Sequence, residues 1–278
     1  SAQVERMRDE IKQLRKKVDV DLGWRYTFSM ANRNEPDRRE YRFDEEGSQQ
    51  DRWLLSDRPE GNERFFSDLR DLNHDVGVDA TASFKPWLGL TMKVKAGLNM
   101  VFKDRVVDTR LYKYLMKGSL VTDTDVLALP PEQLFSAQYI DPDGLQYEEV
   151  TRNTDNYTAN QLLWGFYATA LFPLPKNLEI IAGLRVEGSE QNVKTFQLFS
   201  ASPEVVKAQL KTVDPLPIFG VNWKPTKKMV VRALYARTVS RPEFREMSPA
   251  IQNEVTGGRQ IQGNENLKRA TLDNVDLR

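Results

Sequence analysis

The sequence predicts an all-β protein, an antiparallel up-and-down meander that forms part of a transmembrane β-barrel. Three features of its 278 residues predict this fold. Apolar and polar residues alternate over runs of about a dozen residues, short and long connections alternate along the chain, and no run of about 18 apolar residues could form a transmembrane helix. We therefore expect about eight long strands.

The clearest hairpin covers residues 74–103. Apolar residues alternate with small or polar ones from Val76 to Phe84, residues 85–89 reverse the chain, and alternation resumes from Leu90 to Phe102. Successive side chains of a strand point to opposite faces, so each of these strands has one continuous apolar face. The runs are about twice as long as the usual strand of a soluble domain. Strands of about 9–11 residues tilted by about 45° can cross a bilayer.

The same alternation predicts further strands. On the first of these, residues 18–30, the three aromatic residues Trp24, Tyr26 and Phe28 are typical of an interfacial girdle. A helical spacing of apolar residues predicts a short amphipathic helix over residues 2–17, too short for a coiled coil. The other predicted strands cover residues 18–30, 162–172, 178–187, 217–223 and 229–235, with a last one beginning near Ala270.

The connections fall into two classes, which we expect at opposite ends of the sheet. Short ones lie at 85–89, 173–177 and 224–228, and long polar ones at 31–73, 104–156, 188–213 and 239–268. Strand continuations are expected within the first long connection, at 41–43 and 64–66. A soluble sandwich has shorter strands and no reason to separate loops by length, whereas outer-membrane barrels have short periplasmic turns and long extracellular loops.

Composition excludes several classes of function. Lys plus Arg and Asp plus Glu both number 40, which argues against a nucleic-acid partner. The chain has no Cys, and its single His74 rules out most multi-histidine metal sites and argues against a Ser-His-Asp triad. Residues 141–144 (Asp-Pro-Asp-Gly) lack the remaining ligands of a calcium loop and predict a turn. No catalytic residue, metal ligand or cofactor is predicted.

Two carboxylate pairs are candidates for acid–base chemistry. Glu148 and Glu149 are adjacent, so on a strand they face opposite sides. Asp19 and Asp21 share a face, but no partner acid, base or metal ligand accompanies them. Neither pair predicts an enzyme.

The C-terminal third carries two ordered motifs. Residues 235–246 read Y-A-R-T-V-S-R-P-E-F-R-E, residues 263–268 read G-N-E-N-L-K, and residues 273–278 read D-N-V-D-L-R. They resemble the Y-S-R-T-x-x-R-P-x-F-R-E and G-N-P-x-L-K-x-x-x-x-x-N-Y-D-L-R runs of the TonB-dependent outer-membrane receptor family. Glu265 stands where Pro is usual and Val275 where Tyr is usual. Residues 182–187 (A-G-L-R-V-E) resemble the G-x-R-x-E strand of the same family.

The resemblance implies a bacterial outer-membrane barrel of about 22 strands, closed by an N-terminal plug domain and driven by a TonB complex. It implies active uptake of a scarce nutrient, with a siderophore–iron chelate as the leading substrate and a carbohydrate, cobalamin or peptide as alternatives. A non-transporting barrel for adhesion or passive diffusion, and a soluble β-rich binding or carbohydrate-active domain, are rival hypotheses. We expect residues 1–17 to be a helix or loop segment and residues 18–278 a partial barrel, since neither plug nor TonB box is recognisable.

The same resemblance implies outer-membrane lipid, the receptor's own plug domain, the TonB complex and a small-molecule nutrient as partners. In a plugged barrel the polar strand faces point into the lumen, towards the plug. The residues predicted there are Asp19, Asp21, Arg25, Asp75, Asp79, Lys93, Lys95, Glu179, Arg185 and Glu187.

Extracellular loops are the second candidate region, because loops carry most ligand contacts and because arginine and aromatic side chains suit anionic chelates. The residues predicted to contact ligand are Arg33, Arg38, Arg39, Tyr41, Trp53, Arg110, Tyr112, Tyr114 and Tyr147. Residues 241–243 (Arg-Pro-Glu) are expected to shape the exit from a strand, because Pro fixes φ and ends ladder pairing.

Overall fold

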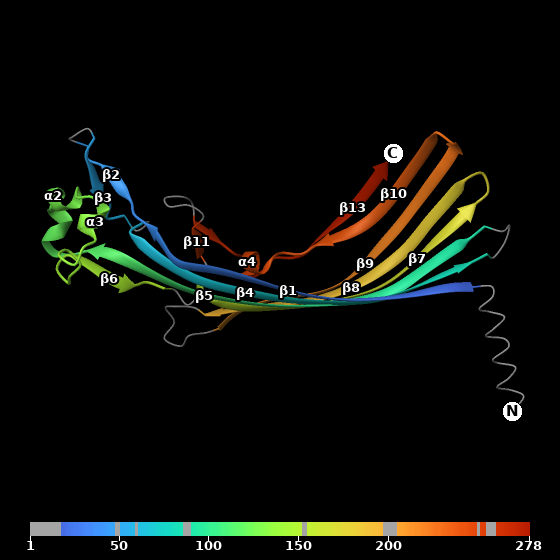
Figure 1. The fold of residues 1–278 in the computed structure, drawn as a ribbon, viewed down its shortest axis with the longest axis horizontal. Helices are drawn as coiled ribbons and strands as arrows, with labels where there is room; N and C mark the ends of the chain where they lie inside the picture. Colours follow the sequence, from blue (N-terminus) through green and yellow to red (C-terminus); the bar gives the residue numbers. More distant parts are fainter. Residues whose placement is uncertain are drawn as a thin grey trace, which may run out of the picture.

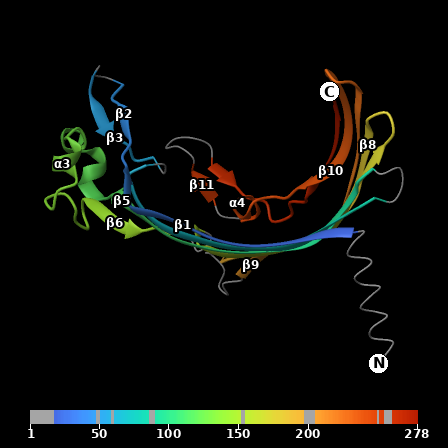
Figure 2. The same cartoon turned by 45° about the vertical axis from the view of Figure 1, so that its right-hand side comes forward.

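The protein forms one long, strongly curved antiparallel sheet (Figures 1 and 2). The computed structural model describes residues 18–47, 51–58, 61–85, 90–151, 155–196, 205–248, 251–253 and 260–278. Each main strand pairs with the one before it, which confirms the antiparallel meander. In order these strands are β1 (Val18–Glu40), β4 (Glu63–Phe84), β5 (Met92–Met116), β7 (Tyr157–Leu174), β8 (Leu178–Phe196), β9 (Val205–Thr226), β10 (Met229–Ser240) and β13 (Ala270–Leu277).

The sheet is an open trough. β1 and β13 form the two ends of the strand order, so the barrel of about 22 strands stays a prediction. The helix predicted over residues 2–17 lies outside the described residues. Among the residues that are described, no helix is both long and apolar enough to cross a membrane.

Several strands are longer than predicted, and the expected bounds of three long connections were wrong. β1 continues to Glu40 and β4 begins at Glu63, so most of 31–73 is strand; the continuation expected at 64–66 is confirmed. Likewise β5 runs to Met116, and β8 and β9 together cover most of 188–213. These extensions carry polar residues on both faces, so the period-2 signal fades although the hydrogen-bonded ladder continues.

The connections are separated by length, as predicted (Figure 1). At one end, a three-residue turn over 175–177 joins β7 to β8, and its last two residues, Lys176 and Asn177, have positive φ angles of 62° and 57°. β9 and β10 meet at the same end through residues 227–228. The long connections leave the opposite end, which we call the distal end.

Two long connections fold together into a small unit at the distal end, here named the distal cap (Figure 1). Its core is formed by Leu55, Tyr114, Leu120, Leu127, Leu134 and Leu145. Its elements are β2 (Phe43–Glu45), β3 (Trp53–Leu55), η1 (Gly118–Thr122), α2 (Thr124–Leu127), α3 (Pro131–Leu134) and β6 (Leu145–Glu149), which pairs with β5.

The last long connection behaves differently. After β10 the chain turns back over the concave face of the sheet, where α4 (Phe244–Met247), β11 (Ile251–Asn253) and β12 (Gln260–Gln262) lie (Figures 1 and 2). We call residues 241–248 the inner segment. Phe244 and Met247 are buried against the sheet. The sequence predicted this stretch only as a polar connection.

Candidate functional site on the inner wall

The strand register separates an apolar face from a polar one. Trp24 lies opposite Val78, Val78 opposite Leu98, and Leu98 opposite Phe166. All four side chains are exposed, Trp24 to 82%. The inner segment packs on the other, concave face, so these apolar residues line the convex face. An exposed apolar surface of this extent is typical of the lipid-facing side of a barrel wall.

The apolar band has the height of a membrane. On β1 it runs from Val18 to Met30, which corresponds to about 28 Å along the membrane normal at a rise of about 3.3 Å per residue and a tilt of about 45°. The band also shifts from strand to strand. Its distal limit on β10 is Tyr235. The register aligns Tyr235 with Val20 on β1, which lies nearer the short-turn end of the sheet than Phe28 does. Such a shift is what tilted barrel strands require.

The residues predicted to face the lumen share the concave face. Asp79 lies opposite both Gly23 and Gly97, and Arg185 lies opposite Tyr167. Register places the whole predicted set there: Asp19, Asp21, Arg25, Asp75, Asp79, Lys93, Lys95, Glu179, Arg185 and Glu187. Their contact with a plug domain stays a prediction.

Ion pairs cross this inner wall between neighbouring strands. Lys95 pairs with Asp79, which also accepts a hydrogen bond from the Tyr167 hydroxyl (3.5 Å). The guanidinium of Arg25 lies over Gly77, where an added Cβ would come within 2.6 Å of its Cζ, and its Nε is 3.9 Å from Asp75. Glycine at position 77 therefore leaves the space in which Arg25 lies flat against the wall.

A buried cluster of charges connects the wall to the inner segment. Arg241 reaches both Glu187 and Asp214, with 3.0 Å between its Nη2 and the Asp214 Oδ2. Asp214 is 1% exposed and also pairs with Arg269 just before β13. Arg185 donates to Glu187 (2.8 Å) and to Asn99 two strands away (2.8 Å). We name Arg185, Glu187, Asp214, Arg241 and Arg269 the arginine–carboxylate cluster.

The cluster fixes both ends of the connection between β10 and β13, because Arg241 and Arg269 converge on the same Asp214 carboxylate. Charged groups so deeply buried are tolerated only when they are paired. Prediction placed Arg241 at the exit of its strand, and the chain does leave β10 there. Next to it, Glu243 caps α4 through a capping box with Glu246.

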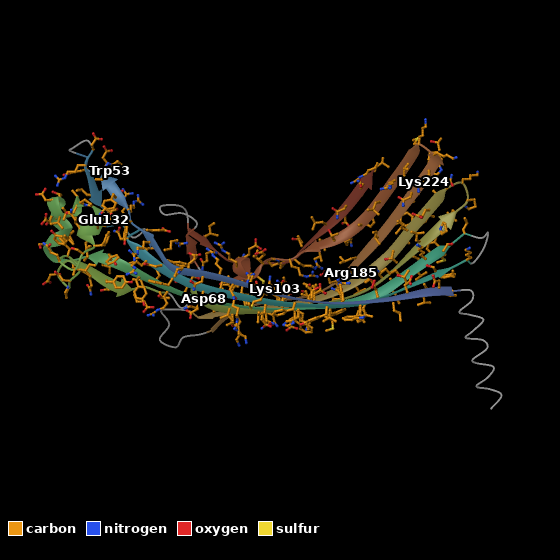
Figure 3. The ribbon with its side chains drawn as sticks, in the orientation of Figure 1. Trp53, Asp68, Lys103, Glu132, Arg185 and Lys224 are labelled. Carbon is orange, nitrogen blue, oxygen red and sulfur yellow. The ribbon has the colours of Figure 1, made fainter. Side chains whose placement is uncertain are left out.

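Apolar and hydrogen-bond contacts hold the inner segment between those ends. Phe244 lies 5.6 Å from the Lys103 ammonium and 5.5 Å from the Arg105 guanidinium, within cation–π range. Arg105 is itself paired with Asp71. The buried Gln191 side chain donates to the Pro242 carbonyl (3.0 Å). Figure 3 shows Lys103 and Arg185 in the middle of the wall, far from Trp53 in the distal cap.

The predicted ligand-contact residues divide into two groups. Four tyrosines come together: Tyr112 stacks on Tyr147 at 5.0 Å, Tyr114 lies 4.9 Å from Tyr147, and Tyr41 lies 6.5 Å from Tyr114. Arg110 lies over the Tyr112 ring at 5.2 Å.

The remaining four stand apart from that group. Arg33, Arg38 and Arg39 lie on β1 and pair with acids close in sequence, and Trp53 is exposed on β3. The structure thus brings together five of the nine predicted side chains. Register puts Arg110 and Tyr112 on the side of β5 that carries Phe102, away from the barrel axis, and Tyr114 belongs to the core of the distal cap.

The family comparison agrees with this geometry. A family model described as "TonB dependent receptor-like, beta-barrel" matches residues 7–277. The chain belongs to the TonB-dependent receptor-like β-barrel family. A search of curated proteins found no match. The family is one of outer-membrane receptors and transporters, not of enzymes. The family match thus confirms the resemblance that the C-terminal motifs indicated.

Two arginine–carboxylate pairs lie at the distal end of the receptor barrel. Arg64 holds Asp37 through two contacts of 2.9 Å, and these hydrogen bonds, with a further one from Arg39, lower the pKa of Asp37 far below its usual range. Arg110 holds Glu149 at 3.1 and 2.8 Å, and this lowers the pKa of Glu149 to about 2, with help from Thr151. Both carboxylates are ionised at neutral pH.

Sequence reasoning missed three residues of the receptor barrel that matter here. Asp214 stands between Val213 and Pro215, and Arg269 stands in a polar loop, so neither had a local signal. Their roles depend on the pairing of β8 with β9 and on the return of the chain over the wall. Arg64, which joins Asp37 to the Phe66 and Tyr147 rings, lay in a stretch predicted as strand but not as a site.

Proposed function

We propose that this chain is part of an outer-membrane TonB-dependent receptor for the active uptake of a scarce nutrient, with a siderophore–iron chelate as the leading substrate. Family membership and the two-faced wall support the outer-membrane barrel. The observation that carries the proposal of active uptake is the inner segment, which is fastened to the concave face by the arginine–carboxylate cluster.

A passive pore would be expected to keep its inner wall open to water. Here Phe244 and Met247 cover part of that wall, and Asp214 and Glu187 are buried beneath the connection. A wall that offers fixed, paired charges suits contact with a folded plug, which would in turn be moved by the TonB complex. Both partners, and the partial barrel over residues 18–278, remain part of this proposal.

An anionic chelate is favoured because of the arginines at the distal end. Arg38 on β1 lies over the Phe65 ring at 4.3 Å, and register puts it with Arg33 on the concave side of the wall. Guanidinium groups supported by rings bind carboxylates and other planar anions well. Carbohydrate, cobalamin and peptide are the alternative substrates.

Uptake by the full-length receptor in its native cell tests the proposal. Cells grown without iron should accumulate radiolabelled ferric chelates, and deletion of the receptor gene should abolish accumulation of one of them. Collapse of the proton gradient should abolish uptake but leave binding at the cell surface. Accumulation that persists without the gradient would indicate a passive pore. If the receptor binds no chelate at the cell surface but takes up cobalamin, a carbohydrate or a peptide, the substrate belongs to that class instead.

A further inference from the structure

Two lysines face each other on the convex side of the wall, distal to the apolar band. Lys194 on β8 lies directly opposite Lys207 on β9. Both share the face of Val186 and Val213, and both are exposed. Lys211, four residues nearer the band on β9, shares this face and is 73% exposed. We call these three residues the lysine patch.

The charges around the patch leave an excess of positive charge. Glu190 pairs with Lys211 at 3.4 Å and accepts a hydrogen bond from Gln209. Asp104 and Asp108 lie two strands away on β5, two residues on either side of Val106, which shares a row with Lys194. Over the part of the chain that is described, no acid forms an ion pair with Lys194 or Lys207. Like charges directly opposite on a sheet repel, so an anion bound between these two lysines would relieve the repulsion.

Protection of a sheet edge does not account for the pair. β9 pairs with β10 only as far as Ile218, so the half of β9 that contains Lys207 is open on that side, and lysine there discourages unwanted strand pairing. Lys194, however, lies on β8, which is bonded to β7 on one side and β9 on the other. A lysine in the interior of the sheet needs another explanation.

The position of the patch matches the head-group layer of the membrane. The continuous apolar run on the convex face of β9, from Trp223 through Phe219, ends at Val213, and Lys211 follows it. Lys207 lies four residues beyond Lys211, which is about 9 Å along the membrane normal for a strand tilted by about 45°. Lysine ammonium groups on flexible stems bend towards lipid head groups, and each is attracted by anionic lipid.

We propose that the lysine patch binds the phosphate groups of an anionic lipid in the outer leaflet of the membrane, with the acyl chains of that lipid on the apolar band around Val186 and Val213. The charge of the patch complements phosphate, and its place directly above the band suits a lipid rather than a soluble anion. The proposal rests on the membrane placement of the barrel and not on which nutrient is taken up.

The test uses the detergent-solubilised full-length receptor and a fluorescent glycolipid, lipid A with two phosphates and six acyl chains. The double variant K194Q/K207Q should bind it at least tenfold more weakly than the wild type. K194R/K207R should bind like the wild type because it retains both charges. The matched control K227Q/K228Q removes two lysines from the opposite end of the sheet, between β9 and β10, and should also bind like the wild type.

Two further arms identify the ligand. Lipid A without phosphates should bind the wild type as weakly as bisphosphorylated lipid A binds the double variant. Millimolar inorganic phosphate should not displace bisphosphorylated lipid A from the wild type. Displacement by inorganic phosphate would overturn the lipid in favour of a soluble anion. The proposal would be overturned if the wild type bound both lipids equally well. It would also be overturned if the wild type and K194Q/K207Q bound bisphosphorylated lipid A equally well. Boil-sensitive gel migration verifies that the variants are folded. Nutrient uptake is measured separately, so that failure of the lipid proposal can be distinguished from failure of the transport proposal.

Discussion

The distal cap and the inner segment are both long polar connections in the sequence, but they are held in place by different forces. The distal cap has its own apolar core, in which Leu134 and Leu145 are completely buried. The inner segment has one short helix and depends on the wall, through Asp214, Gln191 and the apolar surface under Phe244. A connection that encloses a core can keep its shape alone, whereas one without a core takes its shape from what it covers.

The largest effect should come from removing the shared partner of the two arginines. Asp214→Asn leaves Arg241 and Arg269 without their common buried carboxylate, and we expect a loss of about 3 kcal/mol in the free energy of unfolding, measured by urea denaturation in detergent micelles. Asp276→Asn is the control, since Asp276 is half exposed and pairs with exposed Arg278.

Limited proteolysis would show where Asp214→Asn acts. Arg245 is exposed within the inner segment, so trypsin should cut after it faster in the variant than in the wild type, while the distal cap should be unaffected. An unchanged cleavage rate at Arg245 would show that the carboxylate does not hold the inner segment.

A cavity in the distal cap should have a comparable but slightly smaller effect, confined to the cap. Leu134→Ala removes a completely buried side chain, and we expect a loss of about 2–3 kcal/mol. Hydrogen exchange should speed up in α2, α3 and β6 but not in the inner segment. Val121→Ala, at a half-exposed side chain of the same cap, is the control and should cost under about 0.5 kcal/mol. Faster exchange along β8 and β9 as well would contradict the independence of the two regions.

A smaller effect is expected from the hydrogen bond between the wall and the inner segment. Gln191→Ala removes the donor to the Pro242 carbonyl, which should lower the free energy of unfolding by about 1 kcal/mol and accelerate trypsin cleavage after Arg245. Gln209→Ala removes an exposed glutamine from the convex face and serves as the control. Identical cleavage rates in the two variants would argue that the apolar contacts of Phe244 are sufficient.

The smallest effect is a dependence of the distal cap on pH. Because Arg110 lowers the pKa of Glu149 to about 2 in the folded protein, the pair stabilises the cap fully above the ordinary pKa of the carboxyl, near 4.5. That stabilisation is lost as pH falls from about 4.5 to about 2. The thermal midpoint of the wild-type cap should fall further over this range than that of Glu149→Gln. Parallel pH profiles would show that the pair contributes nothing.

The sequence by itself determined the order and faces of the main strands and the separation of short from long connections, but not how far the strands extend. Alternation such as that from Val18 to Met30 is a local signal, because a strand between lipid and lumen must change polarity at every residue. The same parity puts Arg185 and Glu187 on one face of their strand, and the register of the sheet makes that face the concave one.

Only the tertiary structure decided what the long connections do and which charges meet. Asp214 and Arg269 are 55 residues apart, and their pairing depends on register between β8 and β9 and on the return of the chain over the wall. Arg110 and Tyr112 looked like loop residues, but the ladder continues through them and its parity turns them outward. The pairing of distant strands is set by the whole sheet, so no local pattern contains it.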